Sequence, residues 1–320
     1  MIDLLKCNGP FYKANLHCHT TLSDGRMTAK QVRDWYHSHG YQIVAFTDHS
    51  KYAYYPELRS EDFLPIAGVE SAFTCLDLNN TPLKYRLCHI NFLAKDPETA
   101  VYEKEEPTYD LGVINRYIAK MKKAGFLCTL NHPGWSLQTT EEIHGIQGLD
   151  GFEVYNHGSQ YLDNNGDGQA HYALFLNNGK RAWAVATDDN HSGLREDGTI
   201  QPAHDTLGGY IMISMPELSY AAFADAFENG RFYASSGPEI REYYIDEETD
   251  EIVVSCSPVA RVLIKGIHTV RAHRVTSDKD DISYVRIPLT PIRKKEPFFR
   301  LEIMTTDGKR AYSQPYWFED

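Results

Sequence analysis

The chain of 320 residues lacks any long hydrophobic run, and this absence excludes a protein that crosses a membrane with helices. A spanning helix requires about 18 or more largely apolar residues in succession, and no stretch of the sequence approaches that length. Residues Met1–His19 also lack the basic segment followed by an apolar segment that marks a secretory signal. We therefore expect a cytoplasmic protein that has no membrane partner.

Cysteine is sparse and scattered, because no two of the six cysteines form a Cys-x-x-Cys pair. This spacing is typical of reduced thiols and argues against a disulfide scaffold or a zinc ribbon. Cys18, Cys88 and Cys128 lie inside apolar runs, so we expect them in the core.

Basic residues are in the minority, 32 against 44 acidic ones, which gives a formal net charge of −12. A protein that holds long nucleic acid by its phosphates needs a basic surface, so nucleic acid is an unlikely partner. A small anionic substrate remains possible, because bound metal cations can dominate the field of a site. The sequence also lacks internal repeats and low-complexity segments, and it leaves the oligomeric state open.

The first two-thirds of the chain do contain alternating strand and helix patterns. The expected strands are Tyr12–His19, Tyr41–Thr47, Phe63–Glu70, Arg86–Ala94, Phe126–Asn131, Gly151–Tyr155 and Arg181–Thr187. The expected helices are Thr28–His39, Asp110–Ala124 and Gln169–Asn178, and Gly208–Ser214 and Glu217–Glu228 complete the layer. Seven strands of this type predict an α/β fold, a parallel barrel that is closed or nearly closed.

The pattern changes at Gly237-Pro238, after which no long helical pattern occurs. Short strand-like runs separated by charged turns follow, at Ile252–Ser257, Ala260–Ile264, Tyr284–Ile287 and Phe298–Met304. We therefore predict two domains, with the barrel in residues 1–237 and a small β-sandwich-like domain in residues 238–320.

Most histidines lie in the predicted barrel, since 12 of the 14 occur at or before His204. The strongest local pattern is His17-Cys18-His19, because residues i and i+2 of a strand point to the same face. Two imidazoles can then reach one metal ion while Cys18 points to the opposite layer. Polar residues at the carboxyl ends of barrel strands converge on one mouth, so further ligands are expected there.

Possible ligands do follow the other strands. They are Asp24 in the turn Ser23-Asp24-Gly25, His49 in Thr-Asp-His, Glu70 in Gly-Val-Glu, His89, His132 in Asn-His-Pro, and Asp189 and His191 at the end of the seventh strand. Glu153 and Asn156 also stand at a strand end, where a supporting role near the site and a structural role are equally open. The polar run Asp163–Gly168 copies half of a calcium-binding loop but has Leu174 in place of the final glutamate, so we interpret it as a turn.

In this order, the motifs HCHTTLSDG, TDH, GVE, NHP and DNH resemble those of the PHP superfamily, named for polymerase and histidinol phosphatase. The resemblance covers roughly residues 12 to 237. GRFYASSGPEI at Gly230–Ile240 and the tail that ends in PYWF further resemble the branch that includes carbaryl-hydrolase-like proteins. The resemblance implies a distorted seven-stranded β/α barrel and a metal-dependent hydrolase.

The resemblance also implies two to three divalent metal ions. The first would be bound by His17, His19, Glu70 and Asp189, the second by Glu70, His89 and His132, and the third by Asp24, His49 and His191. Mixed nitrogen and oxygen ligands suit zinc, manganese or iron better than calcium. Asp188 directly precedes Asp189, and adjacent strand residues point to opposite faces, so we favour Asp189 as the ligand. Asp188 is then expected to orient an imidazole.

The expected activity is that of a phosphoesterase on a small phosphorylated metabolite or nucleotide. A bound dication lowers the pKa of its water to roughly 7, so that hydroxide can attack phosphorus in line. Asp189, His191 and Glu70 are the predicted catalytic residues. A hydrolase of a non-phosphate ester, amide or carbamate is a first alternative, because the same hydroxide can attack carbon. An exonuclease and a non-catalytic metal-binding module are further alternatives, which the acidic balance and the full ligand set disfavour.

Substrate contacts are expected from loops around the barrel mouth. Arg195, Lys51 and His157 are the predicted substrate-binding residues, since a cation there would suit a phosphate. Trp135, which follows the Asn-His-Pro motif, lies in another such loop.

Overall fold

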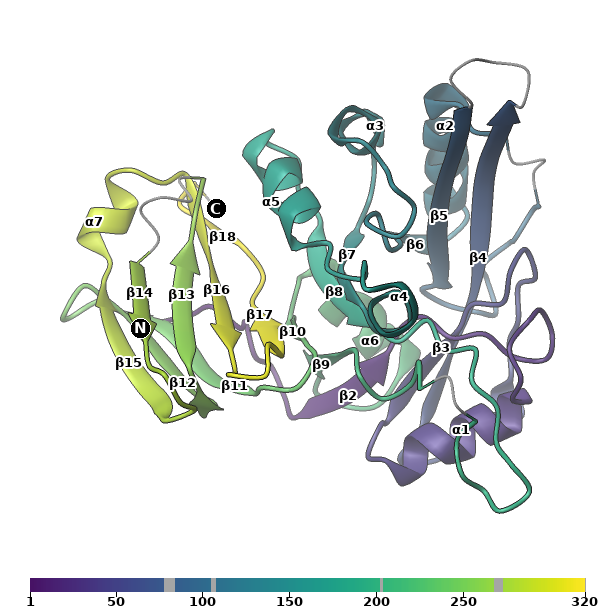
Figure 1. Cartoon of the computed structure of the whole chain (residues 1–320), viewed down its shortest axis with the longest axis horizontal. Helices are drawn as coiled ribbons and strands as arrows, with labels where there is room; N and C mark the ends of the chain where they lie inside the picture. Colours follow the sequence, from purple (N-terminus) through teal and green to yellow (C-terminus); the bar gives the residue numbers. More distant parts are fainter. Residues whose placement is uncertain (78–83, 105–107, 202–203, 268–272, 320) are drawn as a thin grey trace.

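The computed structural model describes residues 1–77, 84–104, 108–201, 204–267 and 273–319 (Figure 1). Its larger sheet has 14 strands, of which β18 (Tyr316–Trp317) pairs only with β16. The order of the others is β14 (His273–Thr276), β13 (Arg261–Lys265), β16 (Phe298–Met304), β17 (Arg310–Tyr312), β10 (Phe232–Ser235), β9 (Tyr210–Ser214), β2 (Phe11–Asn15), β3 (Ile43–Phe46), β4 (Leu64–Asp77), β5 (Lys84–Ala94), β6 (Phe126–Leu130), β7 (Gly151–Asn156) and β8 (Trp183–Thr187). A second sheet of 4 strands has the order β1 (Ile2–Asp3), β11 (Ile240–Asp246), β12 (Glu251–Val259) and β15 (Ile282–Pro288). The predicted α/β class is confirmed.

The helices are α1 (Ala29–Ser38), α2 (Leu111–Lys123), α3 (Thr140–Gly145), α4 (His157–Asp163), α5 (Gln169–Asn177), α6 (Tyr220–Glu228) and α7 (Thr290–Arg293), with a short 3₁₀ helix at Pro56–Leu58. Thr28 and Asp110 cap α1 and α2, because each side chain accepts a backbone N–H of the first turn. Gly40 and Gly125 follow these helices with φ of 79° and 93°, the left-handed conformation that glycine adopts readily. No helix in the described part of the chain is long and apolar enough to span a membrane.

The prediction of a parallel barrel is wrong at one strand. β2, β3 and β4 are parallel, and so are β6, β7 and β8, but β5 runs antiparallel to both β4 and β6. Only residues 78–83 separate β4 from β5, and a parallel crossover needs about a dozen residues or more. A connection of this length therefore permits only an antiparallel pair of β4 and β5.

The two ends of the barrel-like part meet just beyond the strands. The N–H of Asp189 donates to the carbonyl of His17 at 3.0 Å, and the N–H of His19 donates to the carbonyl of Asn190 at 3.0 Å. Within the described residues β8 and β2 share no longer ladder, so a fully closed barrel of seven strands is not formed by strand pairing. These two bonds place the segments after β2 and β8 side by side.

The C-terminal strands form their own hydrophobic core between the two sheets (left in Figure 1). Ile252 and Val254 of β12 pack in this core with Phe299 and Leu301 of β16. The short runs predicted after Glu239 are thus strands, although β17 pairs with β10 and continues the large sheet across residue 237. The domain boundary itself stays a prediction.

Candidate metal centre

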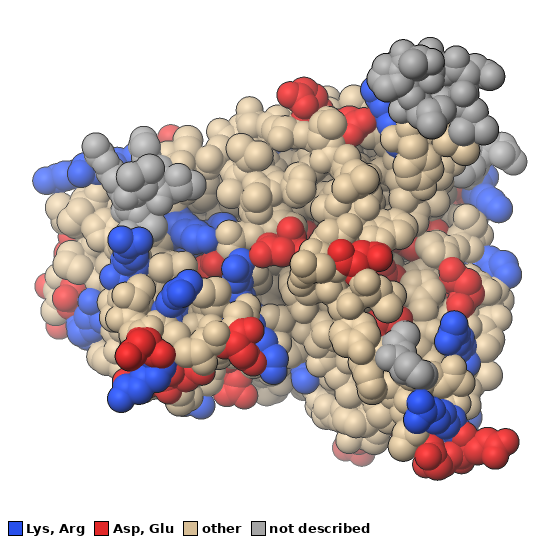
Figure 2. Space-filling view, viewed as in Figure 1, with Lys and Arg blue, Asp and Glu red and all other residues tan. Residues whose placement is uncertain are grey.

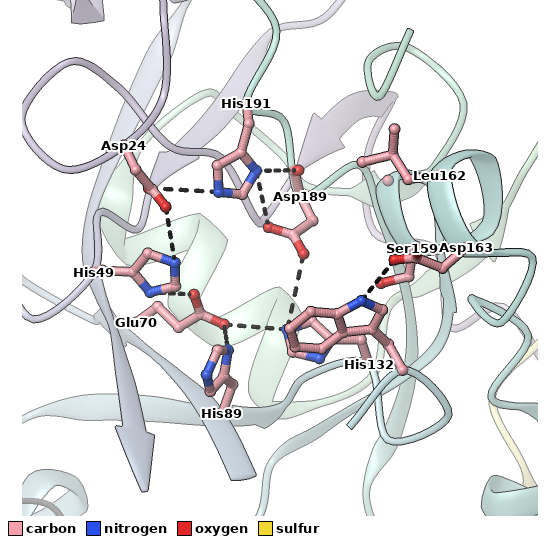
Figure 3. Close-up of a pocket in the computed structure, with 12 residues that line it drawn as sticks. Asp24, His49, Glu70, His89, His132, Ser159, Leu162, Asp163, Asp189 and His191 are labelled. Atoms are coloured by element: carbon pink, nitrogen blue, oxygen red, sulfur yellow. Dashed lines mark hydrogen bonds and ion pairs between the residues drawn. The ribbon is translucent and has the colours of Figure 1, made fainter. Parts of the chain in front are cut away.

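The nine predicted ligands all lie on strands of the large sheet or in the loops that follow them, and Figure 3 shows seven of them, all except His17 and His19. His17 and His19 follow β2 and precede Asp24, His49 follows β3, Glu70 is on β4, His89 is on β5, His132 follows β6, and Asp189 and His191 follow β8. The structure brings these residues together, although 174 positions separate His17 from His191 in the sequence. The convergence follows from the sheet, whose neighbouring strands each deliver a side chain to the same place.

The carboxylate of Glu70 lies at the middle of the cluster and is fully buried. Nitrogen atoms of five imidazoles surround it, at 3.3 Å (His17), 3.4 Å (His19), 2.9 Å (His49), 3.0 Å (His89) and 3.4 Å (His132). Asn131 holds the carboxylate from another side, since its Nδ2 donates to Oε1 at 2.7 Å. A single carboxylate that touches five imidazoles from four segments is placed to bridge cations.

His17, His19 and Asp189 form the tightest group. The Nε2 atoms of the two imidazoles lie 3.2 Å apart, and each lies 3.1 Å from Oδ1 of Asp189. In a tetrahedral zinc site with bonds of about 2.0–2.1 Å, neighbouring ligand atoms are separated by about 3.3–3.4 Å. The spacing of these atoms is therefore close to that of ligands around one ion.

Asp24 gathers a second set of imidazoles at the outer side of the cluster. Its carboxylate oxygens lie 3.6 Å from Nε2 of His49, 3.5 Å from Nε2 of His191 and 3.7 Å from Nδ1 of His19. The Asp24 side chain is 55% exposed, so this part of the cluster is open to solvent.

Four groups of donor atoms in the described residues are compact enough to hold a cation. They are His19 with Asp24, His49 and His191; His17 with His19 and Asp189; His17 with Glu70 and His132; and His49 with Glu70 and His89. In each group the donor atoms lie within 4.8 Å of one another. Because His17, His19 and His49 each belong to two groups, the division of the ligands among three ions stays a prediction.

Glu153 fixes the orientation of the His17 ring. Its Oε1 accepts from Nδ1 of His17 at 2.8 Å and from the hydroxyl of Thr187 at 2.6 Å, and its Oε2 accepts the N–H of His132 at 2.7 Å. When Nδ1 of His17 donates to this carboxylate, the lone pair of Nε2 faces Glu70 and Asp189. Of the two roles left open for Glu153, the geometry favours support of the site.

Two other imidazoles are oriented in the same way. Nδ1 of His132 lies 3.1 Å from the hydroxyl of Ser136, and Nδ1 of His191 lies 2.9 Å from the carbonyl of Asp189. In both rings the remaining Nε2 faces the cluster, at 3.4 Å from Glu70 and 3.5 Å from Asp24 respectively. This pattern is typical of histidines that bind metal through Nε2.

Asp189 and Asp188 point in different directions, as their neighbouring positions predict. Asp189 adopts φ of 56°, a left-handed conformation that is uncommon for a residue with a side chain and that occurs often at functional sites. Asp188 instead accepts from the hydroxyl of Tyr36 at 2.7 Å and from the N–H groups of residues 207–209 at 2.7–2.8 Å. The prediction that Asp188 orients an imidazole is therefore wrong, because its oxygens hold the backbone that leads into β9.

The charges of the cluster are strongly coupled. Burial alone would raise the pKa of Glu70, but the imidazoles of His89 and His17 hold this pKa well below its usual value. Burial opposes ionisation of Asp189 too, and His17 in particular holds the pKa of Asp189 well below its usual value. Burial lowers the pKa of His19 to about 4, so this imidazole is neutral at neutral pH. The carboxylates and His19 are thus in the protonation states that metal ligands require. Against burial, the carboxylates raise the pKa of His17, His49, His132 and His191, so a cation bound by these imidazoles would have to displace protons.

These residues fit a divalent cation by a further observation. Nδ1 of His19 and Oδ1 of Asp189 are buried and have no hydrogen-bond partner in the described part of the structure. Buried polar atoms are rarely left without a partner, because their desolvation costs about 1–3 kcal/mol each. Together with the mixed nitrogen and oxygen donors, they suit zinc, manganese or iron.

A cavity of about 230 Å³, which we call the histidine cavity, opens beside the cluster (Figure 3). Seven of the possible ligands line it, namely Asp24, His49, Glu70, His89, His132, Asp189 and His191. Trp135, Leu162 and Ser159 also line it; the Trp135 ring lies 5.0 Å from the His132 ring, and its Nε1 donates to Asp163 at 2.8 Å. The cavity thus combines a group of possible metal ligands with a partly apolar wall.

The three predicted substrate contacts do not line this cavity. Nζ of Lys51 donates to the carbonyl of Leu22, and Arg195 lies in an exposed turn closed by its N–H bond to Thr199. His157 is held between the hydroxyl of Tyr155 and the carbonyl of His204, each at 3.0 Å. Their role as substrate contacts therefore stays a prediction.

Several supporting residues were missed by the sequence analysis. Asp48 accepts from the N–H of Thr20 at 2.8 Å and from the N–H of Ser23 at 3.0 Å, and so holds the turn that carries Asp24. Asp205 accepts the N–H of His191 at 2.8 Å. Asp48 and Asn131 lie in the motifs Thr-Asp-His and Asn-His-Pro, so the sequence offered a signal for their supporting role, whereas no pattern points to Asp205.

Comparisons with known proteins find likeness at the level of structure alone. No protein-family model matches the chain, and no curated protein matches its sequence. The structural neighbours include a two-domain protein from Bacteroides vulgatus that contains a predicted PHP-like metal-dependent phosphoesterase. It shares 16% identity at a TM-score of 0.47, over 98% of this chain and 97% of that chain.

Two shorter structures are also similar to part of the chain. A candidate metal-dependent phosphoesterase from Bifidobacterium adolescentis shares 15% identity at a TM-score of 0.38, over 56% of this chain and 87% of that chain. An amidohydrolase from Chromobacterium violaceum, solved with bound sulfate and no metal, shares 17% identity at a TM-score of 0.40, over 59% and 90%. The neighbours are thus PHP-like phosphoesterases and an amidohydrolase, and the carbaryl-hydrolase-like branch has no counterpart among these three. At such low similarity, the function must be argued from the cluster itself.

Proposed function

We propose that this chain is a metal-dependent phosphoesterase that hydrolyses a small phosphorylated metabolite or nucleotide. The observation that carries the proposal is the buried Glu70 carboxylate, which has five imidazole nitrogens within 3.4 Å and faces a cavity of about 230 Å³. The fold itself does not require this cluster of imidazoles and carboxylates, because burying so many polar groups opposes folding.

The residues that would hold the cations are the nine predicted ligands. The first ion would be bound by His17, His19, Glu70 and Asp189, the second by the shared Glu70 with His89 and His132, and the third by Asp24, His49 and His191. Divalent zinc, manganese or iron bound there would lower the pKa of a water molecule and offset the charge of a phosphoryl group.

Asp189 and His191 are the proposed proton carriers. Both line the histidine cavity, and the two side chains are in contact, since Nδ1 of His191 lies 3.7 Å from Oδ1 of Asp189. Asp189 would take the proton of the attacking water, and His191, which is 32% exposed and whose Nδ1 already lies 2.9 Å from the Asp189 carbonyl, would exchange a proton with solvent through Nε2 when no cation holds that atom. Glu70 stays ionised, because the surrounding imidazoles hold its pKa low.

The apolar part of the cavity lining would bind the part of the substrate that does not react. Trp135 and Leu162 offer apolar surface, and Ser159 offers a hydroxyl. Among the described residues that line the cavity there is no lysine or arginine. A phosphate group would therefore be held by the imidazoles and the cations they bind, rather than by a basic side chain.

The test is reconstitution of the purified chain with zinc, manganese or iron, followed by assay with p-nitrophenyl phosphate and a panel of sugar phosphates and nucleotides. We expect turnover that is lost in His19→Ala and retained in His144→Ala, a control histidine on α3 that contacts Leu174 away from the cluster. Equal rates in wild type and His19→Ala would contradict the proposal.

A hydrolase of esters or carbamates is a second candidate, and the apolar wall without a basic side chain favours it. The same leaving group can be offered in both chemistries, as 1-naphthyl phosphate and 1-naphthyl N-methylcarbamate. A phosphoesterase will hydrolyse the phosphate at least about tenfold faster, which corresponds to about 1.4 kcal/mol in the barrier. The reverse preference would establish the second candidate. Degradation of single-stranded DNA would instead support an exonuclease, which the small cavity argues against.

A further inference from the structure

A second cavity, which we call the α5 cavity, lies between α5 and the strands β13 and β16, and it encloses about 490 Å³. It shares no lining residue with the histidine cavity. Ala173, Leu174 and Leu176 of α5 and Phe298 of β16 provide its apolar wall. Its volume is in the range of about 300–1,000 Å³ that is usual for small-molecule sites.

The two charged side chains that line the α5 cavity are both cationic, Lys265 and Arg300. Arg300 is only 2% exposed, and its Nη1 has no hydrogen-bond partner within the described residues. Its ion-pair partner among the described residues is Glu302, whose Oε2 lies 3.6 Å from Nη1. A buried guanidinium with an unused donor is costly, and such a group normally has an anionic partner.

Glu302 is already occupied by other groups. Nζ of Lys265 lies 2.7 Å from its Oε2, and Nε2 of Gln169 donates to the same oxygen at 2.6 Å. Nη1 of Arg310 lies 3.9 Å from its Oε1, although Arg310 is also paired with Asp167 at 3.0 Å. Among the described residues that line the cavity there is no carboxylate, so the charge of Arg300 is not fully balanced there. A monoanion would balance this charge, whereas a phosphate dianion would exceed it.

We propose that the α5 cavity binds a small carboxylic acid that has an apolar aryl or alkyl body. The planar guanidinium of Arg300 matches a carboxylate, which can accept two parallel N–H bonds from it. The ligand's body would lie against Ala173, Leu174 and Phe298. The site is independent of the hydrolase activity, because its lining residues are separate from the proposed ligands.

Isothermal titration of the full-length, metal-loaded protein tests the proposal with matched probes. The probes are 3-phenylpropionate, hexanoate and indole-3-acetate, each compared with its uncharged amide. We expect at least one acid to bind at least tenfold more tightly than its amide. Absence of binding by all three acids, or equal binding of each acid and its amide, would overturn the proposal.

Variants locate the bound acid. Arg300→Gln is expected to weaken binding at least tenfold, and Ala173→Trp, which fills the cavity and keeps its charges, is expected to abolish it. Arg261→Gln, exposed on β13, is the charge control and should bind as wild type does. His19→Ala should also bind the acid normally, since the α5 cavity shares no lining residue with the histidine cavity. Loss of binding in that variant would show that the histidine cluster holds the acid instead. Should Arg300→Gln fail to fold, unchanged binding in Ala173→Trp would by itself refute the site.

Discussion

At the scale of single residues, Glu153 shows how the cluster depends on a side chain that touches no substrate. Its two oxygens accept from His17, from Thr187 and from the backbone of His132, and it is fully buried. Ligand orientation by such partners is worth about 10–100-fold in metal affinity or activity. The value of the His17 and His132 ligands thus rests partly on this carboxylate.

Glu153→Gln is therefore expected to lower both metal affinity and turnover of p-nitrophenyl phosphate by about 10–100-fold. In the variant, the amide NH₂ would face one or more of the N–H and O–H groups of His17, Thr187 and His132 that now donate to the Glu153 carboxylate. Metal content by mass spectrometry and steady-state rates at several metal concentrations measure the effect. Glu141→Gln, at an exposed position on α3, is the control, and the account fails if the two variants behave alike.

Asp188 leads to a different prediction, since its contacts are structural. Asp188→Asn replaces one of the two accepting oxygens with an amide NH₂, which then faces at least one of the three backbone N–H groups, and it should cost about 2–4 kcal/mol of unfolding free energy. Urea denaturation measures this loss, with Asp197→Asn as the control, because Asp197 is an exposed turn residue. A free energy of unfolding within about 0.5 kcal/mol of wild type would show that Asp188 does not have this role.

The motifs predicted which residues come together, because several imidazoles and carboxylates at the ends of neighbouring strands are typical of a shared metal site. The substrate contacts stay a prediction, since Lys51, Arg195 and His157 were chosen by position after a motif and do not line the histidine cavity. Backbone turns decide where such side chains point: Lys51 bonds to the Leu22 carbonyl and His157 to the His204 carbonyl. A sequence without relatives to compare gives no signal for these turns.

At the scale of elements, α1 and α2 were predicted close to their observed bounds, whereas the antiparallel direction of β5 was not predicted. The six residues between Asp77 and Lys84 were a usable signal, because so short a connection cannot cross over a sheet. α4 was missed too: Asn156 caps it directly after β7, so no loop separates strand from helix. This helix carries Ser159 and Leu162 to the histidine cavity.

The contact between the loop after β6 and α4 gives a prediction about substrate binding. Trp135→Ala removes the apolar wall and the bond to Asp163, so KM for 1-naphthyl phosphate should rise about 5–30-fold. The KM for glycerol phosphate, which has no apolar group, should change little. Steady-state kinetics with both substrates measure the difference, and an equal rise for both would argue against an apolar subsite.

At the scale of the whole molecule, the chain has separate hydrophobic cores, and the N-terminal residues pack in the C-terminal one. Leu4 and Leu5 lie in the core between the two sheets, and β1 pairs with β11. Side chains of both charges are interspersed on the face shown in Figure 2, in line with the acidic balance of the sequence. This distribution offers no extended basic surface on that face for nucleic acid.

Leu5→Ala tests whether this second core contributes to stability independently of the metal centre. Deleting a buried leucine side chain costs about 2–5 kcal/mol, and Leu5 is 3% exposed. We expect that loss in urea denaturation, with metal content of the native protein unchanged. Leu137→Ala, at a residue that is 79% exposed, should change little. Loss of bound metal in Leu5→Ala would mean that the two parts are more closely coupled than proposed.

The central claim is that side chains from separate segments bind a group of divalent cations around Glu70. Metal analysis of the purified chain after loading with zinc, manganese or iron tests this directly. The account predicts about two to three tightly bound ions per chain, and fewer in Glu70→Gln, because this carboxylate contacts imidazoles from both sides of the cluster. Substoichiometric metal in the wild type, or the same metal content in Glu70→Gln, would contradict it.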